Sequence, residues 1–329
     1  MLILTAEEVR QALPMSAAIE AVKAAYRALS AGEAEVPLRL SLPVAPHEGV
    51  SLFMPAYVGG KAEEALTVKV VSVFPHNPER EMPTIYAAVL VLEPDTGRPL
   101  ALLEGGTLTA LRTGAASGAA TDVLARPESR VLAVFGAGTQ GRTQAEAVCT
   151  VRPIETVWVY DVSRERAEAF TAEMAGFGPV PRDVRVASTP AEAVRDADVI
   201  CTATIATRPV FDDADLKPGV HINGIGAYTP EMAEVPPETV ARALVVVDSR
   251  EAVLAEAGDL IQPIEAGIIT ADHIHAELGE ILLGRKPGRT SEAQITFFKS
   301  VGVAVQDAMA SQVALRNAKA QGLGKEVAF

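Results

Sequence analysis

Residues 130–142 read Arg130-Val131-Leu132-Ala133-Val134-Phe135-Gly136-Ala137-Gly138-Thr139-Gln140-Gly141-Arg142. A run of apolar residues leads directly into a Gly-x-Gly-x-x-Gly pattern, and a segment that favours a helix follows. In this strand–turn–helix context the glycines indicate a dinucleotide-binding turn. Gly136 permits the tight turn, Gly138 lets the backbone approach a pyrophosphate, and Gly141 lets the helix pack closely on the strand. The segment therefore predicts that a dinucleotide binds at the N-terminus of this helix.

After Pro127 the chain alternates between short apolar segments and helical segments. Strands are expected over residues 131–135, 156–160, 184–187, 198–202, 220–223 and 244–247. Helices are expected between them, as over residues 164–174, 191–195 and 237–242. This alternation predicts a Rossmann-type doubly wound parallel sheet. A long helix is expected over residues 292–321, where it could pack back on the first domain.

The region before Pro127 has a different pattern. Two helices are expected over residues 5–32, the second amphipathic and ended by Gly32. Strands are expected over residues 66–74, 84–92 and 99–103, followed by a helix rich in small residues over 108–124. Because these strands follow each other without intervening helices, the sheet should be mostly antiparallel. The fold class is therefore α/β, with a Rossmann sheet and a separate α+β domain.

Composition limits the classes of function. The chain has 329 residues, enough for two domains, and its net charge of −13 argues against nucleic acid or an anionic membrane as partner. The N-terminus lacks the basic and apolar segments of a signal peptide, and no stretch is apolar enough to span a bilayer. Cys149 and Cys201 form no Cys-x-x-Cys or metal cluster, so free thiols are expected. We expect a cytoplasmic protein.

Loops after the predicted parallel strands extend the candidate nucleotide site. Asp161 ends the second strand, where an acid accepts hydrogen bonds from the ribose hydroxyls and favours NAD over NADP. Ser163 and Arg164 could instead hold a 2′-phosphate, so NADP stays possible, and Asp161 could simply cap a helix. The loops after the fourth and fifth strands should line the nicotinamide side, and ordinary turns without a ligand are the alternative for both. The candidate cofactor-binding residues are Gly136, Ala137, Gly138, Thr139, Gln140, Gly141, Asp161, Val162, Ser163, Arg164, Thr202, Ala203, Thr204, Ile225 and Gly226.

Three basic residues form the candidate substrate site. Lys69 lies in mid-strand and should be half buried, which lowers a lysine pKa and makes it a possible proton donor or base. A lysine extending to solvent from a sheet edge is the alternative. Arg112 has small neighbours that leave its guanidinium free to bind a carboxylate, and Arg39 is a second candidate; surface salt bridges are the alternative for both. The five histidines are scattered, and no metal site is expected.

Together these residues resemble the ornithine cyclodeaminase/mu-crystallin family. The resemblance covers nearly the whole chain and includes Lys69, the glycine turn and residues 54–55, 74–78, 83–84, 97–101, 109–117 and 298–302. It implies a homodimer joined through the sheets of the first domains. It also implies a substrate-binding and dimerisation domain of residues 1–122 with 303–329, and a Rossmann dinucleotide-binding domain of residues 123–302. In such a fold Arg39, Lys69 and Arg112 would hold the substrate carboxylate, with Ser300 and Val301 beside the nicotinamide.

Members of this family catalyse several reactions, all with hydride transfer at a carbon bearing nitrogen and carboxylate. They include ornithine cyclodeaminases, L-alanine dehydrogenases, ketimine reductases and Δ1-pyrroline-2-carboxylate reductases. A cyclodeaminase places an aspartate where this chain has Tyr228, and Met54 stands where a second acid is expected. Tyrosine is neutral at neutral pH and is a poor base, so we favour an imine reductase or amino-acid dehydrogenase that uses a small amino or imino acid. Glu231 could restore an acid, so ornithine cyclodeaminase stays an alternative, and a non-catalytic crystallin-like binder is a third.

Overall fold

The computed structural model describes residues 1–60 and 64–328 of the chain. Their contacts divide the chain into two compact units. The first unit comprises Met1–Arg112 and Val303–Phe329, and the second comprises Thr113–Gly302. The division falls inside helix α3 (Gly105–Leu124).

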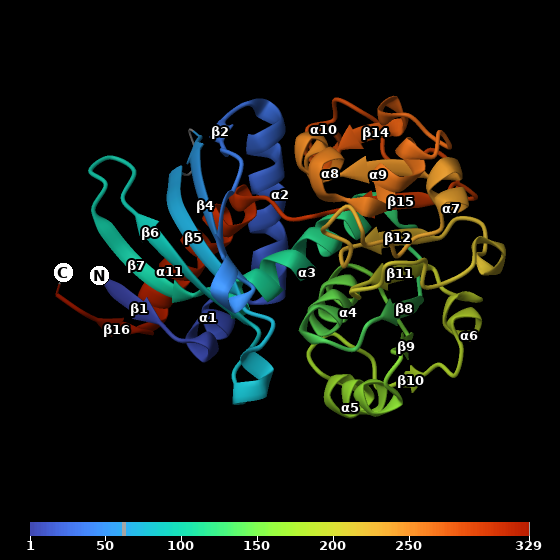
Figure 1. Cartoon of the computed structure of the whole chain (residues 1–329), viewed down its shortest axis with the longest axis horizontal. Helices are drawn as coiled ribbons and strands as arrows, with labels where there is room; N and C mark the ends of the chain where they lie inside the picture. Colours follow the sequence, from blue (N-terminus) through green and yellow to red (C-terminus); the bar gives the residue numbers. More distant parts are fainter. Residues whose placement is uncertain (61–63, 329) are drawn as a thin grey trace. The chain divides into compact units, whose positions relative to one another are not determined.

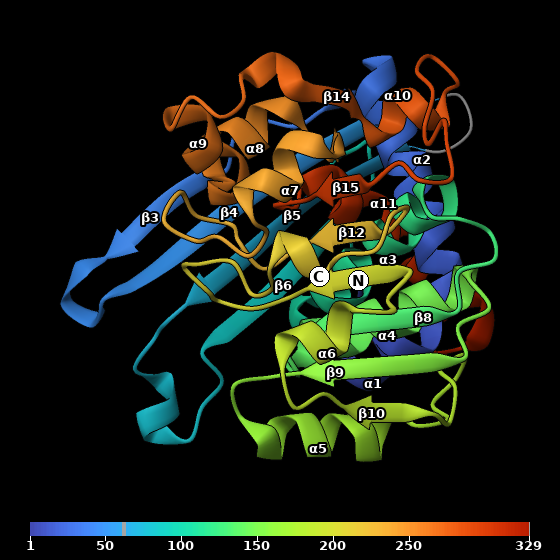
Figure 2. The same cartoon turned by 90° about the vertical axis from the view of Figure 1, so that its right-hand side faces the viewer.

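The first unit is built on one sheet whose strands follow the order β16-β1-β7-β6-β5-β4-β2, with β3 paired to β4. Every neighbouring pair is antiparallel except β1 and β7, so the predicted mostly antiparallel sheet is confirmed. The hairpin of β3 and β4 extends beyond the helices of this unit (Figure 2). The strands are β1 (Leu2–Leu4), β2 (Ala34–Glu35), β3 (Leu40–Val44), β4 (Gly49–Gly59), β5 (Glu64–Val73), β6 (Ile85–Leu92), β7 (Pro99–Glu104) and β16 (Lys325–Glu326).

Helices cover one face of this sheet (Figure 1). They are α1 (Ala6–Ala12), α2 (Met15–Ala31) and α11 (Ala304–Gln321), with short 3₁₀ turns at Ala45–His47 and Asn77–Arg80. Helix α2 ends at Gly32 with φ +75°, as its sequence predicts. Helix α11 packs on α2 and on strands β4, β5 and β6. The C-terminal part of the chain thus joins the core of the first unit.

The second unit contains a wholly parallel sheet in the order β10-β9-β8-β11-β12-β15-β13-β14 (Figure 2). Its strands are β8 (Val131–Phe135), β9 (Thr156–Tyr160), β10 (Val184–Val186), β11 (Val199–Thr202), β12 (His221–Gly224), β13 (Leu244–Val247), β14 (Ile274–Glu277) and β15 (Thr296–Lys299). Its helices are α4 (Thr139–Val151), α5 (Arg164–Met174), α6 (Pro190–Val194), α7 (Pro237–Arg242), α8 (Arg250–Glu256), α9 (Gly258–Glu265) and α10 (Leu278–Leu282), with 3₁₀ turns at Asp213–Asp215 and Ala271–His273. The predicted Rossmann-type sheet is confirmed.

The expectation of a helix beginning at Glu292 was wrong. Residues before α11 form β15, which inserts between β12 and β13 and places Lys299 at the end of an interior strand. Strand β14 was also not predicted. Polar residues occupy half of each strand, so neither is a continuous apolar run, and tertiary pairing decides the conformation.

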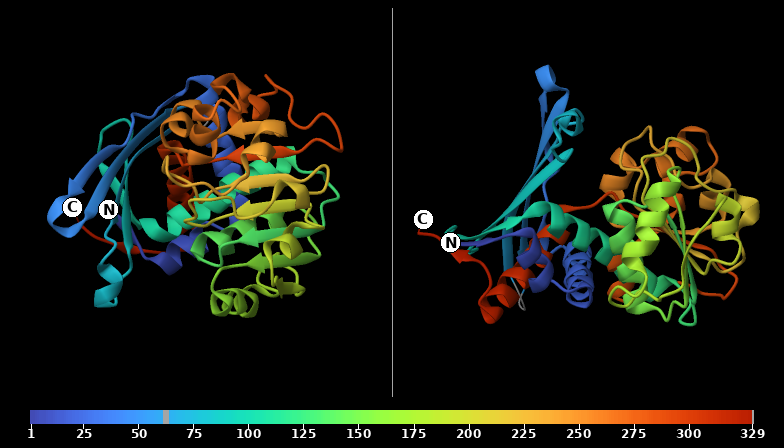
Figure 3. Two further views of the ribbon diagram at one scale, coloured as in Figure 1. Left: turned by 45° about the vertical axis from the view of Figure 1, so that its right-hand side comes forward. Right: turned by 90° about the horizontal axis from the view of Figure 1, so that it is seen from below.

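Helices of the second unit lie on both faces of its sheet (Figure 3), and two hydrophobic clusters form its core. Alternate residues of β8 point to opposite faces: Leu132 and Val134 enter one hydrophobic cluster, and Ala133 and Phe135 enter the other. This double burial explains why strands such as β8 and β13 are continuous apolar runs. In the described part of the chain, no helix combines the length and apolar character needed to cross a membrane.

Candidate functional site

The glycine turn connects β8 to α4 and forms a cradle that a side chain would fill. Gly136 has φ +94°, and a Cβ there would lie 2.5 Å from the Ala203 carbonyl oxygen. A Cβ on Gly141 would lie 2.0 Å from the Gly136 carbonyl oxygen. Gly138 precedes the first turn of α4, caps it with no side chain, and borders open space. The amide groups at this helix end therefore suit the pyrophosphate of a dinucleotide.

The loop after β9 is tied to the glycine turn by Asp161. Its carboxylate accepts hydrogen bonds from the amides of Ala137, at 2.8 Å, and Ser163, at 2.9 Å. The alternative that Asp161 caps a helix is wrong, because Ser163 caps α5 by accepting from the Arg166 amide. Arg164 pairs with Glu168 at the surface. Val162, between Asp161 and Ser163 in the sequence, is 96% exposed. It is an apolar side chain that faces solvent at the edge of the candidate cofactor site.

The loops after β11 and β12 are joined by Glu234, which sequence reasoning missed. Its buried carboxylate accepts hydrogen bonds from both the amide and the hydroxyl of Thr204 and from the hydroxyl of Thr202. It also accepts from the amides of Gly226 and Ala227, at 2.7 and 3.0 Å. The signal that the sequence offered for a buried acid was the position of Glu234 between two apolar residues, Ala233 and Val235. The acid considered from sequence, Glu231, is exposed.

Glu234 belongs to a buried charge cluster. One oxygen of Asp259 accepts from the amides of Glu234 and Val235, and the other pairs with Lys299 Nζ at 2.8 Å. Burial raises the pKa of Glu234, the Asp259 carboxylate raises it further, and the charge of Lys299 opposes both. We call Glu234, Asp259 and Lys299 the β15 cluster.

A second buried acid holds the loop after β15. Asp248 accepts hydrogen bonds from the Ser300 hydroxyl at 2.7 Å and from the amides of Val301 and Gly302. Burial raises the pKa of Asp248, and these hydrogen bonds act against that rise. Ser300 and Val301, expected beside the nicotinamide, are therefore fixed in the second unit by a residue that the sequence did not reveal.

In the first unit Lys69 is buried more deeply than predicted. It is 2% exposed, because β5 lies between β4 and β6 rather than at the sheet edge. This position excludes a lysine that extends to solvent. Lys69 Nζ lies 2.7 Å from Asp307 Oδ2, and the buried Met54 is its register partner on β4.

Arg112 approaches the same carboxylate from α3. Its Nε donates to Asp307 Oδ1 at 3.2 Å, and its Nη1 donates to Gln306 Oε1 at 2.8 Å. The Gln306 amide donates in turn to the Tyr26 hydroxyl. The alternative of a surface salt bridge for Arg112 is wrong, because Arg112 and Asp307 are both buried. We call Lys69, Arg112 and Asp307 the β5 cluster.

Cations outnumber carboxylates in the β5 cluster. Burial lowers the pKa of Lys69 to about 8, Asp307 opposes the change, and the charges of Arg112 and Arg39 add to it. Burial alone would raise the pKa of Asp307, but Lys69 and Arg112 outweigh burial and hold that pKa below its ordinary value. Arg39, just before β3, is thus close enough to act electrostatically on Lys69.

The predicted residues fall into two groups. Arg39, Met54, Lys69 and Arg112 belong to the first unit. The candidate cofactor residues belong to the second unit, as does Tyr228, which is 47% exposed in the loop after β12. Within the described residues, no group of three or more histidine, cysteine, aspartate or glutamate side chains is arranged to hold a metal ion.

Comparison with known proteins gives consistent results. A profile of the ornithine cyclodeaminase/mu-crystallin family matches residues 1–322. The chain is 43% identical to Δ1-pyrroline-2-carboxylate reductase of Bacillus cereus, over the full length of both chains (100% of each).

Solved structures are also similar. The structure of Thermococcus litoralis Δ1-pyrroline-2-carboxylate reductase in complex with NADH and L-proline has a TM-score of 0.93 and 42% identity, with 99% of this chain and 100% of that chain covered. An archaeal alanine dehydrogenase dimer with bound NAD has a TM-score of 0.91 and 35% identity, with coverage of 100% and 99%.

Proposed function

The chain belongs to the ornithine cyclodeaminase/mu-crystallin family, and we propose that it is an NAD-dependent reductase of a small cyclic imino acid such as Δ1-pyrroline-2-carboxylate. The observation that carries the proposal is the β5 cluster, in which a buried ammonium and a buried guanidinium share one carboxylate. The Bacillus cereus relative and the Thermococcus litoralis structure, which contains NADH and L-proline, support this choice of substrate.

The surplus positive charge of the β5 cluster suits an anionic substrate. Buried charges are costly unless they are paired, and Asp307 compensates only one of the two cations. A substrate carboxylate supplies the second negative charge. Arg112 would bind this carboxylate with its planar set of donors, with Arg39 assisting from the segment before β3.

Lys69 would supply the proton that the reduction requires. Bound NADH supplies the hydride that converts the C=N carbon to a CH group. The ring nitrogen then takes one proton, so that one hydride and one proton are added across the double bond. An ammonium with a pKa of about 8 is protonated at neutral pH and still releases its proton readily. Lys69 would recover the proton from solvent after product release.

The side chains expected to bind a second amine of the substrate argue against ornithine cyclisation. Met54 is buried and apolar next to Lys69, and Tyr228 provides no carboxylate. Glu231 is exposed. A cyclic imino acid has an apolar ring and no distal ammonium, and it needs no further acid. This difference favours the reductase over the cyclodeaminase.

We propose that the second unit binds NAD through the glycine turn, Asp161 and the loops that follow β11, β12 and β15. The exposed Val162 and Ile205 provide apolar surface for the adenine ring. Asp161 disfavours a 2′-phosphate, so NADH should be preferred to NADPH. Residues 123–302 would then be the dinucleotide-binding domain, and 1–122 with 303–329 the substrate-binding and dimerisation domain.

A homodimer joined through the sheets of the first units is part of this proposal. Five large apolar side chains on or beside β3 and β6 are exposed: Leu38, Leu40, Leu42, Ile85 and Tyr86. Apolar surface of this kind typically marks an interface, and the related archaeal alanine dehydrogenase is a dimer. We also propose a cytoplasmic location, where Cys149 and Cys201, both buried free thiols, would stay reduced.

A substrate panel tests the reaction. The purified protein is assayed for NADH oxidation with Δ1-pyrroline-2-carboxylate and with pyruvate plus ammonia, and for ammonia release from L-ornithine with catalytic NAD. We expect the highest kcat/KM with the cyclic imino acid and a lower value with NADPH than with NADH. Ammonia release from ornithine without net NADH formation would identify a cyclodeaminase instead. NADH binding without turnover of any imino or oxo acid would indicate a crystallin-like binder.

A further inference from the structure

We infer that Glu234 is a positioning residue that fixes the two loops proposed to surround the nicotinamide, and that Asp259 and Lys299 fix Glu234. The inference rests on the proposed NAD-dependent function. It assigns a purpose to buried charges that take no part in the proposed chemistry. Its basis is the set of hydrogen bonds that end on the Glu234 carboxylate.

Glu234 reaches back from the segment between β12 and α7 to the carboxyl ends of two strands. Its Oε1 accepts from the Thr204 amide at 2.6 Å and the Thr204 hydroxyl at 2.8 Å, after β11. Its Oε2 accepts from the Thr202 hydroxyl and from the amides of Gly226 and Ala227, after β12. One carboxylate thus sets the distance between two adjacent loops. Ligands of a parallel sheet bind at these strand ends.

The packing around Glu234 leaves little room for these loops to move. A Cβ on Gly226 would lie 2.2 Å from the Thr204 carbonyl oxygen and 2.4 Å from Glu234 Oε1. The two loops therefore contact each other directly, with the carboxylate against both. Any loss of its hydrogen bonds changes the position of main-chain groups that the cofactor would contact.

The remainder of the β15 cluster holds Glu234 itself. Asp259 accepts from the amides of Glu234 and Val235, at 2.6 and 3.0 Å. Lys299, at the end of β15, neutralises one of the two carboxylates and is completely buried. Donors from the protein engage every carboxylate oxygen of this cluster. These groups therefore fix the backbone and need no ligand of their own.

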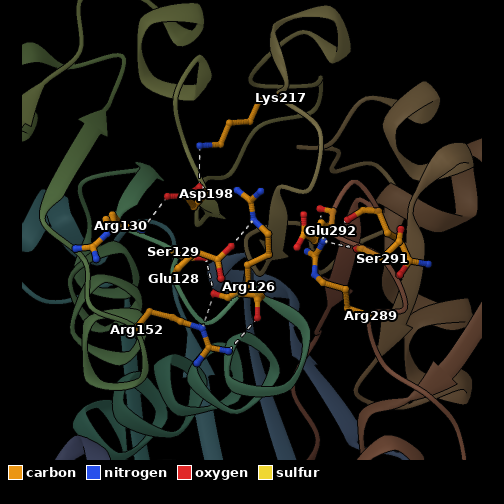
Figure 4. A network of polar contacts seen from close by, with 12 residues as sticks. Arg126, Glu128, Ser129, Arg130, Arg152, Asp198, Lys217, Arg289, Ser291 and Glu292 are labelled. Atoms are coloured by element: carbon orange, nitrogen blue, oxygen red, sulfur yellow. Dashed lines mark hydrogen bonds and ion pairs between the residues drawn. The ribbon is translucent and has the colours of Figure 1, made fainter.

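The test is Glu234→Gln, which keeps the shape of the side chain but replaces an acceptor oxygen with an NH2 group that must face an amide or hydroxyl donor. The matched control is Asp198→Asn at the opposite, amino end of the same sheet. Asp198 is also buried and accepts from two amides, those of Arg130 and Val131, while pairing with Arg126 and Lys217 (Figure 4). Both variants lose a buried carboxylate, but only the carboxylate of Glu234 contacts the loops proposed to bind the cofactor.

NADH binding is measured by fluorescence titration, along with the melting temperature and steady-state kinetics. We expect Glu234→Gln to raise the Kd for NADH about tenfold and to lower kcat about tenfold or more. The NADH emission spectrum should also change. Asp198→Asn should lower the melting temperature to a similar extent and leave the Kd for NADH unchanged.

If Glu234→Gln is not obtained folded, Thr202→Val replaces it, because that variant removes one buried hydroxyl bond to Glu234 at nearly constant volume. A rise in the Kd for NADH of about threefold is then expected. An unchanged Kd in the folded variant overturns the inference, as does an equal rise in Asp198→Asn. Failure of the unaltered protein to bind NADH would instead refute the proposed function.

Discussion

Among the described residues are two buried lysine–aspartate ion pairs with nearly equal nitrogen–oxygen distances. Lys69 pairs with Asp307 at 2.7 Å in the first unit, and Lys299 pairs with Asp259 at 2.8 Å in the second. Their surroundings have opposite charge. The β5 cluster adds Arg112, so that cations exceed carboxylates, whereas the β15 cluster adds Glu234, so that carboxylates exceed cations.

This difference in charge distinguishes the β5 cluster, as the proposed binding site, from the β15 cluster, as a structural support. The surplus negative charge of the β15 cluster is spread over hydrogen bonds from amides and hydroxyls, which a carboxylate accepts well. The surplus positive charge of the β5 cluster calls for a further anion. An ion pair alone therefore reveals little about function, and the sign of the charge that remains beyond the pair is the more informative quantity.

Lys69→Met gives the largest expected effect. It tests whether the β5 cluster takes part in the reaction. The variant removes the proposed proton donor and part of the positive charge that attracts the substrate. We expect kcat/KM for imine reduction to fall by about 10³-fold, measured by NADH oxidation with Δ1-pyrroline-2-carboxylate. The Kd for NADH should not change, because the candidate cofactor residues belong to the other unit. A loss of less than about tenfold would contradict a catalytic role.

Lys299→Met makes the same substitution in the other pair and should chiefly affect stability. It leaves Asp259 and Glu234 buried without a cation, so the free energy of unfolding should fall by about 3 kcal/mol or more. Lys69→Met should cost less, since Arg112 still compensates Asp307. Denaturant titration of both variants gives the comparison. Equal losses of unfolding free energy would show that the two clusters do not differ in the proposed way.

The sequence predicted those helices, strands and turns that have local signals better than the elements that depend on tertiary pairing. The apolar run before Gly136 and the glycine pattern define a strand and turn through local chemistry, and both are present. The predicted helix at residues 164–174 agrees with α5 at both ends, and Ser163 gives a local N-cap signal for its start. Strand β15 has no such signal. Only its pairing with β12 and β13 makes Thr296–Lys299 a strand.

The same limit applies to the charged sites. Lys69 and Arg112 stand out locally, as a lysine in an apolar strand and an arginine among small residues. Their partner Asp307 is 238 residues from Lys69 and 195 from Arg112 along the chain. Glu234 was overlooked in favour of the nearby Glu231, because its apolar neighbours Ala233 and Val235 indicate burial but do not show which loops its carboxylate binds. Such pairings arise from topology, which one sequence does not display.

The pH dependence of kcat/KM provides the finest test, because Asp307 and Asp259 should differ in their effect on it. Lys69 must be protonated to donate, and burial lowers its pKa to about 8. The rate of imine reduction should therefore be constant below about pH 8 and fall as pH rises above it. A bound substrate carboxylate favours the charged lysine, so the corresponding fall in kcat should occur at higher pH than the fall in kcat/KM.

Asp307→Asn should move the fall in kcat/KM to lower pH. The Asp307 carboxylate is the group that raises the pKa of Lys69 against burial and against Arg112, so its loss leaves only influences that lower that pKa. Asp259→Asn removes the equivalent carboxylate from the β15 cluster and should leave the position of the fall unchanged, even where it reduces the rate. If both variants shift the fall equally, the titrating group is not Lys69. If neither does, Asp307 does not control the proton that the reaction uses, and the surplus charge of the β5 cluster serves substrate binding alone.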